Sequence, residues 1–517
     1  MIKFPRGVAA LAVACLAIGL AWGHTFAAAP KVLTVVQNAD AITLDPWNTG
    51  ANVALGLERV FYEQMFGFDA TMKVRSGLVK SWGVSPDALT YTFKLQPGVK
   101  FQDGTPFNAE AVKVNLDRVL DQNNHLQKYG LFHTISHIQT VKALDQTTVQ
   151  LTLSAPSATL INNLSHPSGG MVSPAALTKY GAKGIATHPV GTGPFTFDSW
   201  VHGDRIVAKR NPNYWRPSTV GVDEIVFRNV PDATQALAML KTGEAQFVYP
   251  IDPVDVKSIT GQPGVKVTNT PSIYVTFLTM NERYEPFGKA NVRLAMNYAV
   301  NKQALISTLY LGYAKEMRSA VGSQLDGYVP VGTYPFDVEK AKRMLAEGGY
   351  PQGFTATLWV PNDTFSQKEA VFLQQQFSQI GVKVTITPME SGTFDAAFYQ
   401  PPDKMKGQLF LTGFSPSNGA TDWVLRANLS TVAWTPALFN AGFYSNPQVD
   451  KLLGDAERTT ATIRRNAIYK QVQEIVFKDA PLVWLAEPTD VWGQSAKVTD
   501  AYVLPDQTVQ VQFAQMH

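Results

Sequence analysis

The chain has a single cysteine, Cys15, which lies inside an apolar segment at the N-terminus. One cysteine cannot form an intramolecular disulfide, so no part of the fold can be held by such a cross-link. Stability must come from a packed core, and the 45% hydrophobic and 11% aromatic content is typical of a well-packed globular protein. About 490 residues beyond the leader exceed what one core usually supports, which predicts two or three lobes.

The first 29 residues have the pattern of an export signal. Lys3 and Arg6 form a short positive region, residues 8–22 an apolar core, and residues 25–29 a small-residue end suited to signal peptidase. We expect cleavage near Ala27, which defines residues 1–27 as a signal peptide. The mature protein then leaves the cytoplasm and contains no thiol.

Two other readings of the leader remain open. Residues 12–15 loosely resemble a lipoprotein box, in which Cys15 would be acylated and held at the membrane. Cys15 lies in the middle of the apolar run rather than at its end, which favours the cleaved form. An uncleaved anchor is the other alternative, although the apolar core is shorter than the roughly 20 residues that a bilayer span needs.

The charge balance excludes some classes of partner. The formal net charge is +3, and removal of Lys3 and Arg6 lowers it to about +1, with no long run of one sign. We therefore expect no nucleic-acid partner. The 18 Tyr and 10 Trp residues belong mostly to the core, but in an exported protein some can also line a ligand cleft.

Local patterns predict helices and strands along the whole chain. In the first half we expect a strand at 32–36, a helix at 55–66, a strand at 90–95, a helix from Asn108 to Leu120 and a strand pair over 138–153. The antiparallel strands and the helix over 80–189 form an α+β unit inserted between other segments.

The second half alternates helices with strands. The patterns predict, in order, a helix at 233–241 capped by Asp232, a strand at 245–251, a helix at 338–347 begun by Asp337, a strand at 356–360, a helix at 369–380 and a strand at 382–387. This alternation indicates α/β lobes with mostly parallel sheets. No flexible linker is visible, so we expect the lobes to be joined by crossing strands that permit a hinge.

The motifs of common enzyme classes are missing. There is no Gly-x-Ser-x-Gly elbow and no Ser-x-x-Lys pair, and Gly191-Thr192-Gly193 lacks the third glycine of a dinucleotide-binding loop. His133 and His137 have the spacing of two metal ligands on a helix, but no third ligand accompanies them. We expect no enzyme activity, no cofactor and no metal site. A secreted hydrolase remains the alternative of a different class.

A polar loop is the strongest candidate for recognition. Residues 412–423 follow the apolar strand 408–411 and are rich in glycine, hydroxyls, amides and aromatic residues. Such an edge of an open α/β sheet is where ligands bind. Backbone N–H groups and hydroxyls there can accept a polar ligand, whereas a plain polar turn with Trp423 in the core is the structural alternative.

Three sequence blocks carry a resemblance to a known family. They are residues 91–104, 189–195 and 287–302, the last containing Ala295-Met296-Asn297-Tyr298-Ala299-Val300-Asn301-Lys302. The chain resembles the extracytoplasmic solute-binding proteins of peptide-type ABC importers (family 5) throughout its mature length. The resemblance implies a fold of the α/β class, periplasmic binding protein-like (class II, peptide-binding type), in which two α/β lobes flank a cleft and an extra α+β domain is inserted.

The resemblance also implies a division of the chain. Lobe I comprises residues 30–79, 190–284 and 487–517, the inserted domain residues 80–189, and lobe II residues 285–486. Such a protein closes over its ligand and presents the closed form to a permease in the inner membrane. We expect it to act as a monomer.

Ligand-side segments resemble those of the family members that bind glutathione. These segments are residues 123–126, 242–247, 422–423, 438–440 and 443–446. Phe414 stands where the family has tryptophan, and Arg426 replaces a small polar residue. Receptors for di- or oligopeptides, haem, nickel or opines remain alternatives.

The resemblance nominates a set of ligand-binding residues. Asp422 is the candidate partner of a ligand ammonium, because Ser417, Asn418 and Ala420 replace the acidic cluster of dipeptide-binding relatives. Arg318 and Arg426 are candidates for the carboxylates of glutathione. The remaining candidates are Tyr274, Ser415, Ser417, Asn418 and Trp423.

Overall fold

The computed structural model describes residues 29–517. The predicted signal peptide, Cys15 and the cleavage site near Ala27 lie outside the described residues. Lys31–His517 form one compact unit. Within it, no helix has both the length and the apolar character needed to cross a bilayer.

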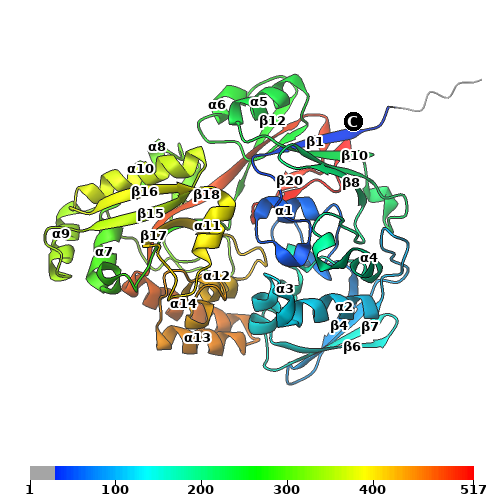
Figure 1. Cartoon of the computed structure of the whole chain (residues 1–517), viewed down its shortest axis with the longest axis horizontal. Coiled ribbons are helices and arrows are strands. Elements are labelled where there is room, and N and C mark those ends of the chain that lie inside the picture. The colour runs from blue at the N-terminus through cyan, green and yellow to red at the C-terminus, as the bar shows by residue number, and fades with distance from the viewer. Residues whose placement is uncertain (1–28) are drawn as a thin grey trace, which may run out of the picture. The chain divides into compact units, whose positions relative to one another are not determined.

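A long strand, β18 (Leu482–Ser495), connects the two halves of a twelve-stranded sheet. Its first half pairs with β13 (Val275–Met280) and β14 (Ala314–Glu316), and its second half pairs with β12 (Val265–Pro271) and β11 (Phe247–Val248). Figure 1 shows β18 running from one half to the other. The chain crosses a second time where β12 continues into β13. Crossing strands were expected from the absence of a linker, and these two are present.

The remaining strands of this sheet lie on either side of the crossing. One half contains β1 (Val32–Gln37), β10 (Glu224–Asn229), β9 (Arg205–Arg210) and β8 (Phe195–Val201), and the other β17 (Leu409–Phe414), β15 (Thr355–Pro361) and β16 (Lys383–Met389). Parallel pairs occur only at β1 and β15, while β18 runs antiparallel to every neighbour. The prediction of mostly parallel sheets is therefore wrong, because returning strands rather than helical crossovers make most connections.

A second, wholly antiparallel sheet has the order β4-β5-β7-β6. Its strands are β4 (Val79–Val84), β5 (Thr90–Leu95), β7 (Thr148–Leu153) and β6 (Ile138–Asp145). Helix α2 (Ala109–Leu120) packs on β6 and β7 through its buried face. The Asn108 side chain accepts a hydrogen bond from the Ala111 N–H and caps the helix as predicted.

Several other predictions agree closely with the structure. Helix α5 (Ala233–Thr242) is capped by Asp232 and ends at Gly243, and α9 (Val338–Glu347) is capped by Asp337. Helix α10 (Thr364–Ser378) begins five residues before the expected start, because the Asp363 side chain caps it. Of the strand predicted over 245–251, only β11 forms.

The helix predicted at 55–66 is mostly wrong. Helix α1 (Asn52–Glu58) ends eight residues earlier than expected, and the next segment pairs with residues 193–195. The Gly193 N–H donates to the Phe61 carbonyl and the Phe195 N–H donates to the Val60 carbonyl, each at 2.9 Å. The apolar residues of this segment have helical spacing in the sequence, but they do not share one helical face. Each is buried by different neighbours.

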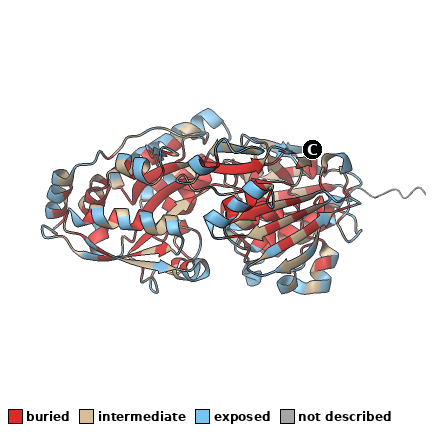
Figure 2. Ribbon diagram, turned by 90° about the horizontal axis from the view of Figure 1, so that it is seen from above, coloured by how far each residue is buried: buried red, intermediate tan, exposed pale blue. Residues whose placement is uncertain are grey.

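The other elements are short or peripheral to these two sheets. The helices are α3 (Leu160–Leu164), α4 (Pro174–Gly184), α6 (Val256–Ile259), α7 (Ala290–Tyr298), α8 (Lys302–Thr308), α11 (Ser391–Phe398), α12 (Thr421–Leu429), α13 (Pro447–Glu457) and α14 (Thr462–Asp479). The strands are β2 (Phe66–Phe68), β3 (Val74–Ser76), β19 (Val498–Thr499), β20 (Tyr502–Val503), β21 (Val509–Gln510) and β22 (Gln515–Met516). Burial concentrates on the strands, while the outer helix faces are exposed (Figure 2).

Gly193 gives a test of the close packing between residues 60–61 and 193–195. A Cβ at Gly193 would lie 2.5 Å from the carbonyl carbon of Phe61, and backbone cannot move aside as a side chain can. We expect Gly193→Ala to cost about 1–3 kcal/mol, which lowers the thermal midpoint by about 1–3 °C for a unit of this size. Gly83→Ala is the control, since a Cβ there meets nothing within 4 Å. Equal midpoints for the two variants would contradict the prediction.

Candidate functional site

A cavity of about 450 Å³, here called cavity 1, opens where β18 crosses between the halves of the sheet. Residues of both crossing segments line it, including Tyr274 before β13 and Asp490 in β18. Helix α10 contributes Glu369, and the end of β17 contributes Leu411–Phe414. The lining therefore comes from strands of both halves and from the helices beside them, as expected for a ligand site at a sheet crossing.

The end of β17 offers backbone groups to cavity 1. Strand β15 pairs with β17 only at Leu409 and Phe410, whereas β13 pairs along all of β17. Among the described residues, no strand pairs with the β15-facing edge of residues 411–414. Backbone N–H and C=O groups on such an edge can pair with an extended peptide ligand.

Cavity 1 contains two buried carboxylates with no cationic partner among the described residues. Glu369 is 3% exposed and Asp490 is 7% exposed. Tyr310 donates to Oε1 of Glu369 at 3.2 Å, while Oε2 has no hydrogen bond from the described chain. Tyr249 and Gln507 donate to Oδ1 of Asp490 at 3.0 and 2.9 Å, and Oδ2 is buried without a partner.

The burial of these carboxylates perturbs their acidity. Burial raises the pKa of Glu369 to about 7, against an opposing hydrogen bond from Tyr310. Burial likewise raises the pKa of Asp490 to about 7, although Gln507 and Tyr249 donate to it. Burial, followed by the charges of Glu369, Asp363 and Asp490, raises the pKa of the Tyr274 hydroxyl. Perturbed acids of this kind cluster at functional sites.

A second cavity of about 690 Å³, cavity 2, shares Tyr399 and Phe439 with cavity 1. Residues 122–131 line one side and residues 434–439 the other, with Trp423 between them. The two cavities are therefore adjacent. Their volumes fall in the range of about 300–1,000 Å³ that is usual for small-molecule sites.

Lys128 is the buried cation of cavity 2. The residue is only 5% exposed, and burial lowers the pKa of its ammonium to about 8. Its Nζ forms no hydrogen bond or ion pair within residues 29–517. Glu58 is the acidic group that acts on it, but burial and then the charge of Asp45 raise the pKa of Glu58, which favours the neutral carboxyl.

Tyr274 is the one predicted ligand residue that lines cavity 1. A Cβ at position 413 would overlap the Tyr274 phenol, so Gly413 in β17 makes room for the ring. The hydroxyl donates no hydrogen bond to the described chain. Tyr274 therefore lies at cavity 1 and has a hydroxyl that is available to a ligand.

Ser415, Ser417 and Asn418 are used for contacts within the chain. The Ser415 hydroxyl donates to the Asp506 carbonyl at 3.0 Å. Ser417 is buried, and its N–H donates to the Ser415 carbonyl at 2.9 Å. The Asn418 amide donates to Oδ1 of Asn163 at 2.7 Å, and the side chain also accepts from the Ala420 N–H. None of the three lines cavity 1 or cavity 2.

Asp422 and Arg426 are paired with each other on α12. Arg426 donates from Nε and one terminal nitrogen to the two oxygens of Asp422, at 2.8 and 2.9 Å, and Tyr469 also donates to Asp422. Burial opposes ionisation of Arg426, but the Asp422 charge outweighs it and raises the pKa of the guanidinium. The carboxylate expected to hold a ligand ammonium is thus neutralised inside the chain. It faces a separate cavity of about 260 Å³.

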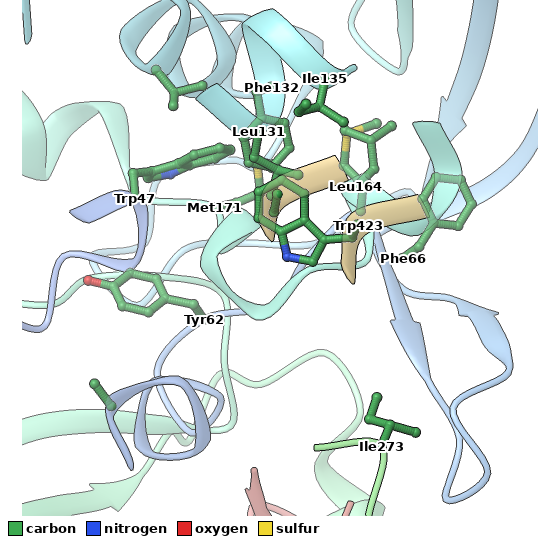
Figure 3. Packing of buried hydrophobic residues seen from close by; sticks show 14 of the residues in the cluster. Trp47, Tyr62, Phe66, Leu131, Phe132, Ile135, Leu164, Met171, Ile273 and Trp423 are labelled. Carbon is green, nitrogen blue, oxygen red and sulfur yellow. The ribbon is translucent and has the colours of Figure 1, made fainter. Parts of the chain in front are cut away.

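Trp423 and Arg318 lie apart from cavity 1. Trp423 is buried and lines cavity 2 together with Leu131, and Figure 3 shows its indole among the apolar side chains around Leu131 and Leu164. Arg318 is exposed and lines neither cavity 1 nor cavity 2. Of the eight predicted residues, the structure brings Tyr274 and Trp423 to the two adjacent cavities.

Sequence reasoning missed Glu369, Asp490 and Lys128. Position 369 was expected at the start of a helix, where an acidic residue is ordinary, but it is in the second turn of α10. Asp490 did give a signal, but one that it shares with Glu487, because residues 487–490 (Glu-Pro-Thr-Asp) separate two apolar runs. Lys128 has no local signal. Within residues 29–517, no group of three His, Cys, Asp or Glu side chains is placed to hold one metal ion.

Comparison with protein families gives one match over most of the chain. The model of the bacterial extracellular solute-binding proteins, family 5, matches residues 73–436. The chain is 42% identical to the glutathione-binding protein GsiB of Pectobacterium atrosepticum over 480 residues, covering 92% of this chain and 93% of that protein. It is 38% identical to the protein of the same name from Escherichia coli K12 over 503 residues, covering 97% and 98%.

Solved structures show the same fold. The periplasmic binding protein DppA from Helicobacter pylori, in complex with the peptide STSA, has a TM-score of 0.83 and 28% identity, covering 93% of this chain and 98% of that one. A dipeptide-binding protein from Pseudoalteromonas, in complex with Met-Leu, has a TM-score of 0.86 and 22% identity, covering 94% and 100%.

The Asp422–Arg426 pair predicts a structural effect of its removal. Arg426→Ala leaves the 1%-exposed Asp422 carboxylate without a cation and with Tyr469 as its remaining side-chain donor, so we expect the free energy of unfolding to fall by about 3–5 kcal/mol. Arg458→Ala is the control, because its ion pair with Asp455 is exposed. Urea denaturation of both variants checks this, and an unchanged midpoint for Arg426→Ala would show that the pair is not structural.

Glu369 predicts a pH-dependent stability difference. Its carboxyl has an ordinary pKa of 4.5 and a pKa of about 7 in the fold, where Tyr310 and Asp363 are its neighbours. Its contribution to stability is therefore full below pH 4.5 and is lost as the pH rises through about 7. Glu369→Gln does not titrate, so its stability relative to wild type should rise by up to about 3 kcal/mol over that interval. Urea denaturation of the ligand-free proteins at several pH values measures this, with exposed Glu474→Gln as control; a constant difference contradicts it.

Proposed function

Since the chain belongs to the bacterial extracellular solute-binding proteins of family 5, we propose that it is the substrate-binding component of an ABC importer and that it binds glutathione. The observation that carries the ligand is the 38–42% identity, over nearly the whole length, to relatives named for glutathione binding. Receptors for di- or oligopeptides, haem, nickel or opines are the alternatives within the same class. The peptide-bound structural relatives favour peptides among them.

The geometry of the site supports a peptide-like ligand. Glutathione has two amide groups, and the unpaired edge of residues 411–414 offers backbone groups that can pair with them. The adjacent cavities provide enough volume for a tripeptide and contain charged groups of both signs. Tyr274, which lines cavity 1 together with the two acids, is the predicted site residue that we carry into this proposal.

We propose closure of two lobes as the mechanism, with lobe I formed by residues 30–79, 190–284 and 487–517, the inserted domain by 80–189 and lobe II by 285–486. Contacts between the inserted domain and lobe II support it. The Asn162 amide donates to the Asn418 carbonyl at 3.0 Å, and Nε2 of His137 lies 2.7 Å from Glu457. Ligand binding stabilises the closed state by its higher affinity for that state, and the crossing strands absorb the motion.

The biological setting follows from this function. After cleavage near Ala27 the receptor acts in the periplasm as a monomer and delivers its ligand to an inner-membrane permease. No covalent chemistry is needed for that cycle. The mature chain would contain no cysteine, so it could not exchange thiols with a thiol or disulfide ligand.

A ligand screen tests the proposed function. The chain without residues 1–27 is mixed with glutathione, dipeptides or nickel, and its thermal midpoint and binding heat are measured. At a ligand concentration 100 times Kd we expect about 2.7 kcal/mol of stabilisation, or a rise of about 3 °C in the midpoint. A shift with dipeptides but none with glutathione would overturn the glutathione assignment, while no shift with any of the three would contradict glutathione together with its dipeptide and nickel alternatives.

A further inference from the structure

We propose that the two cavities bind opposite ends of one zwitterionic ligand, with its ammonium group at Glu369 and Asp490 in cavity 1 and its distal carboxylate at Lys128 in cavity 2. This inference rests on the proposed function, because it assumes a ligand with both groups. For glutathione it places the γ-glutamyl end beside β18 and the glycine carboxylate beside residues 122–131.

The charges that line the cavities have opposite signs. Cavity 1 is lined by Asp252, Glu369, Asp395 and Asp490, and its lining contains no Lys, Arg or His. Cavity 2 is lined by His125 and Lys128, and its lining contains no Asp or Glu. A dipolar ligand therefore has one favourable orientation across Tyr399 and Phe439, the two residues that both cavities share.

The acids of cavity 1 are buried and incompletely hydrogen-bonded, as expected of a site that binds a cation. A buried carboxylate costs free energy unless a cation or several hydrogen bonds compensate it. Glu63 shows what compensation looks like in this chain, because Tyr214, Trp215 and Arg216 all donate to it. Glu369 has one oxygen without such a donor, and so does Asp490. A ligand ammonium supplies the missing donors.

The α-carboxylate of a γ-glutamyl group would accompany that ammonium into cavity 1. The hydroxyl of Tyr274 and the backbone N–H groups on the unpaired edge of β17 can donate to it there. Asp422 cannot replace the acids of cavity 1, since Arg426 already occupies both of its oxygens.

Lys128 is distinguished by comparison with another buried lysine. Lys302 is 3% exposed, and its Nζ donates to the carbonyls of Asn297 and Tyr334 at 2.8 and 3.1 Å. Lys128 is about as buried, yet its Nζ has no such acceptor within residues 29–517 and lies at cavity 2. The first lysine stabilises the fold, whereas the second keeps an ammonium available for a carboxylate.

The test is a pair of cycles that combine protein variants with modified ligands. Calorimetry measures the binding of glutathione, N-acetylglutathione and glutathione amidated at its glycine carboxylate to wild type, Glu369→Gln, Asp490→Asn and Lys128→Met. We expect each acid variant and N-acetylation to weaken binding at least about tenfold alone, with little further loss when combined. Lys128→Met and amidation should likewise each weaken binding, with little further loss when combined. For the other pairs, such as Lys128→Met with N-acetylation or an acid variant with amidation, the two losses in affinity should multiply.

Control variants separate these effects from damage to the fold. Glu474→Gln and Lys142→Met change exposed charges and should leave the affinity unchanged. Glu369→Gln and Asp490→Asn remove uncompensated buried charges, so the ligand-free variants should unfold at the same temperature as wild type or higher. A lower midpoint together with multiplicative losses would assign the acids to stability and overturn the proposal.

Each remaining outcome also supports or overturns the inference. Multiplicative losses within the expected pairs overturn the inference but leave glutathione binding intact. Coupling between Lys128→Met and N-acetylation reverses the orientation and overturns it as well. If wild type binds a dipeptide and not glutathione, the same cycles with the dipeptide, its N-acetyl form and its amide decide the inference separately. If wild type binds none of these ligands, the proposed function and the inference both fail.

Discussion

Strand β18 holds the two halves of the large sheet together. Its fourteen residues pair with β13 and β14 in one half of the large sheet and with β11 and β12 in the other. A single strand shared by two halves keeps them in contact without a disulfide. It also fixes where a cleft can open, because the segment between the two sets of pairs is the place where the sheet changes partners.

That position explains why polar groups are tolerated inside so apolar a strand. Asp490 lies two residues after Pro488, the last residue of β18 that pairs with β14, and it lines cavity 1. In a continuous sheet core, an acid with one unpartnered oxygen would only reduce stability. At a ligand site the same acid contributes to binding, because the ligand supplies the hydrogen-bond donor or cation that the chain does not.

The sequence predicted the elements that have local signals. Its predictions failed where contacts with distant segments determine the structure. The caps Asn108, Asp232 and Asp337 identified three helices, because a cap acts within one helical turn. Residues 55–66 were misassigned because their burial comes from residues 193–195. Cavity 1 joins residues 274, 369 and 490, and no local pattern reports such a contact. The Asp422–Arg426 pair was readable, since i,i+4 charges pair on any helix over 421–429.

Several buried charges of this chain differ in how far the chain itself satisfies them, and composition alone does not show that difference. Arg426, Lys302 and Glu63 are surrounded by the chain's own donors or acceptors, and so their charges are satisfied before any ligand arrives. Glu369 and Lys128 are equally buried but incompletely satisfied, and each faces a cavity. Glu58 is also buried and neither of its oxygens has a partner, but it lines neither cavity, so missing partners alone do not identify a binding group. The combination of an unsatisfied buried charge with a cavity points to recognition, whereas a satisfied charge, however buried, is evidence only about the fold.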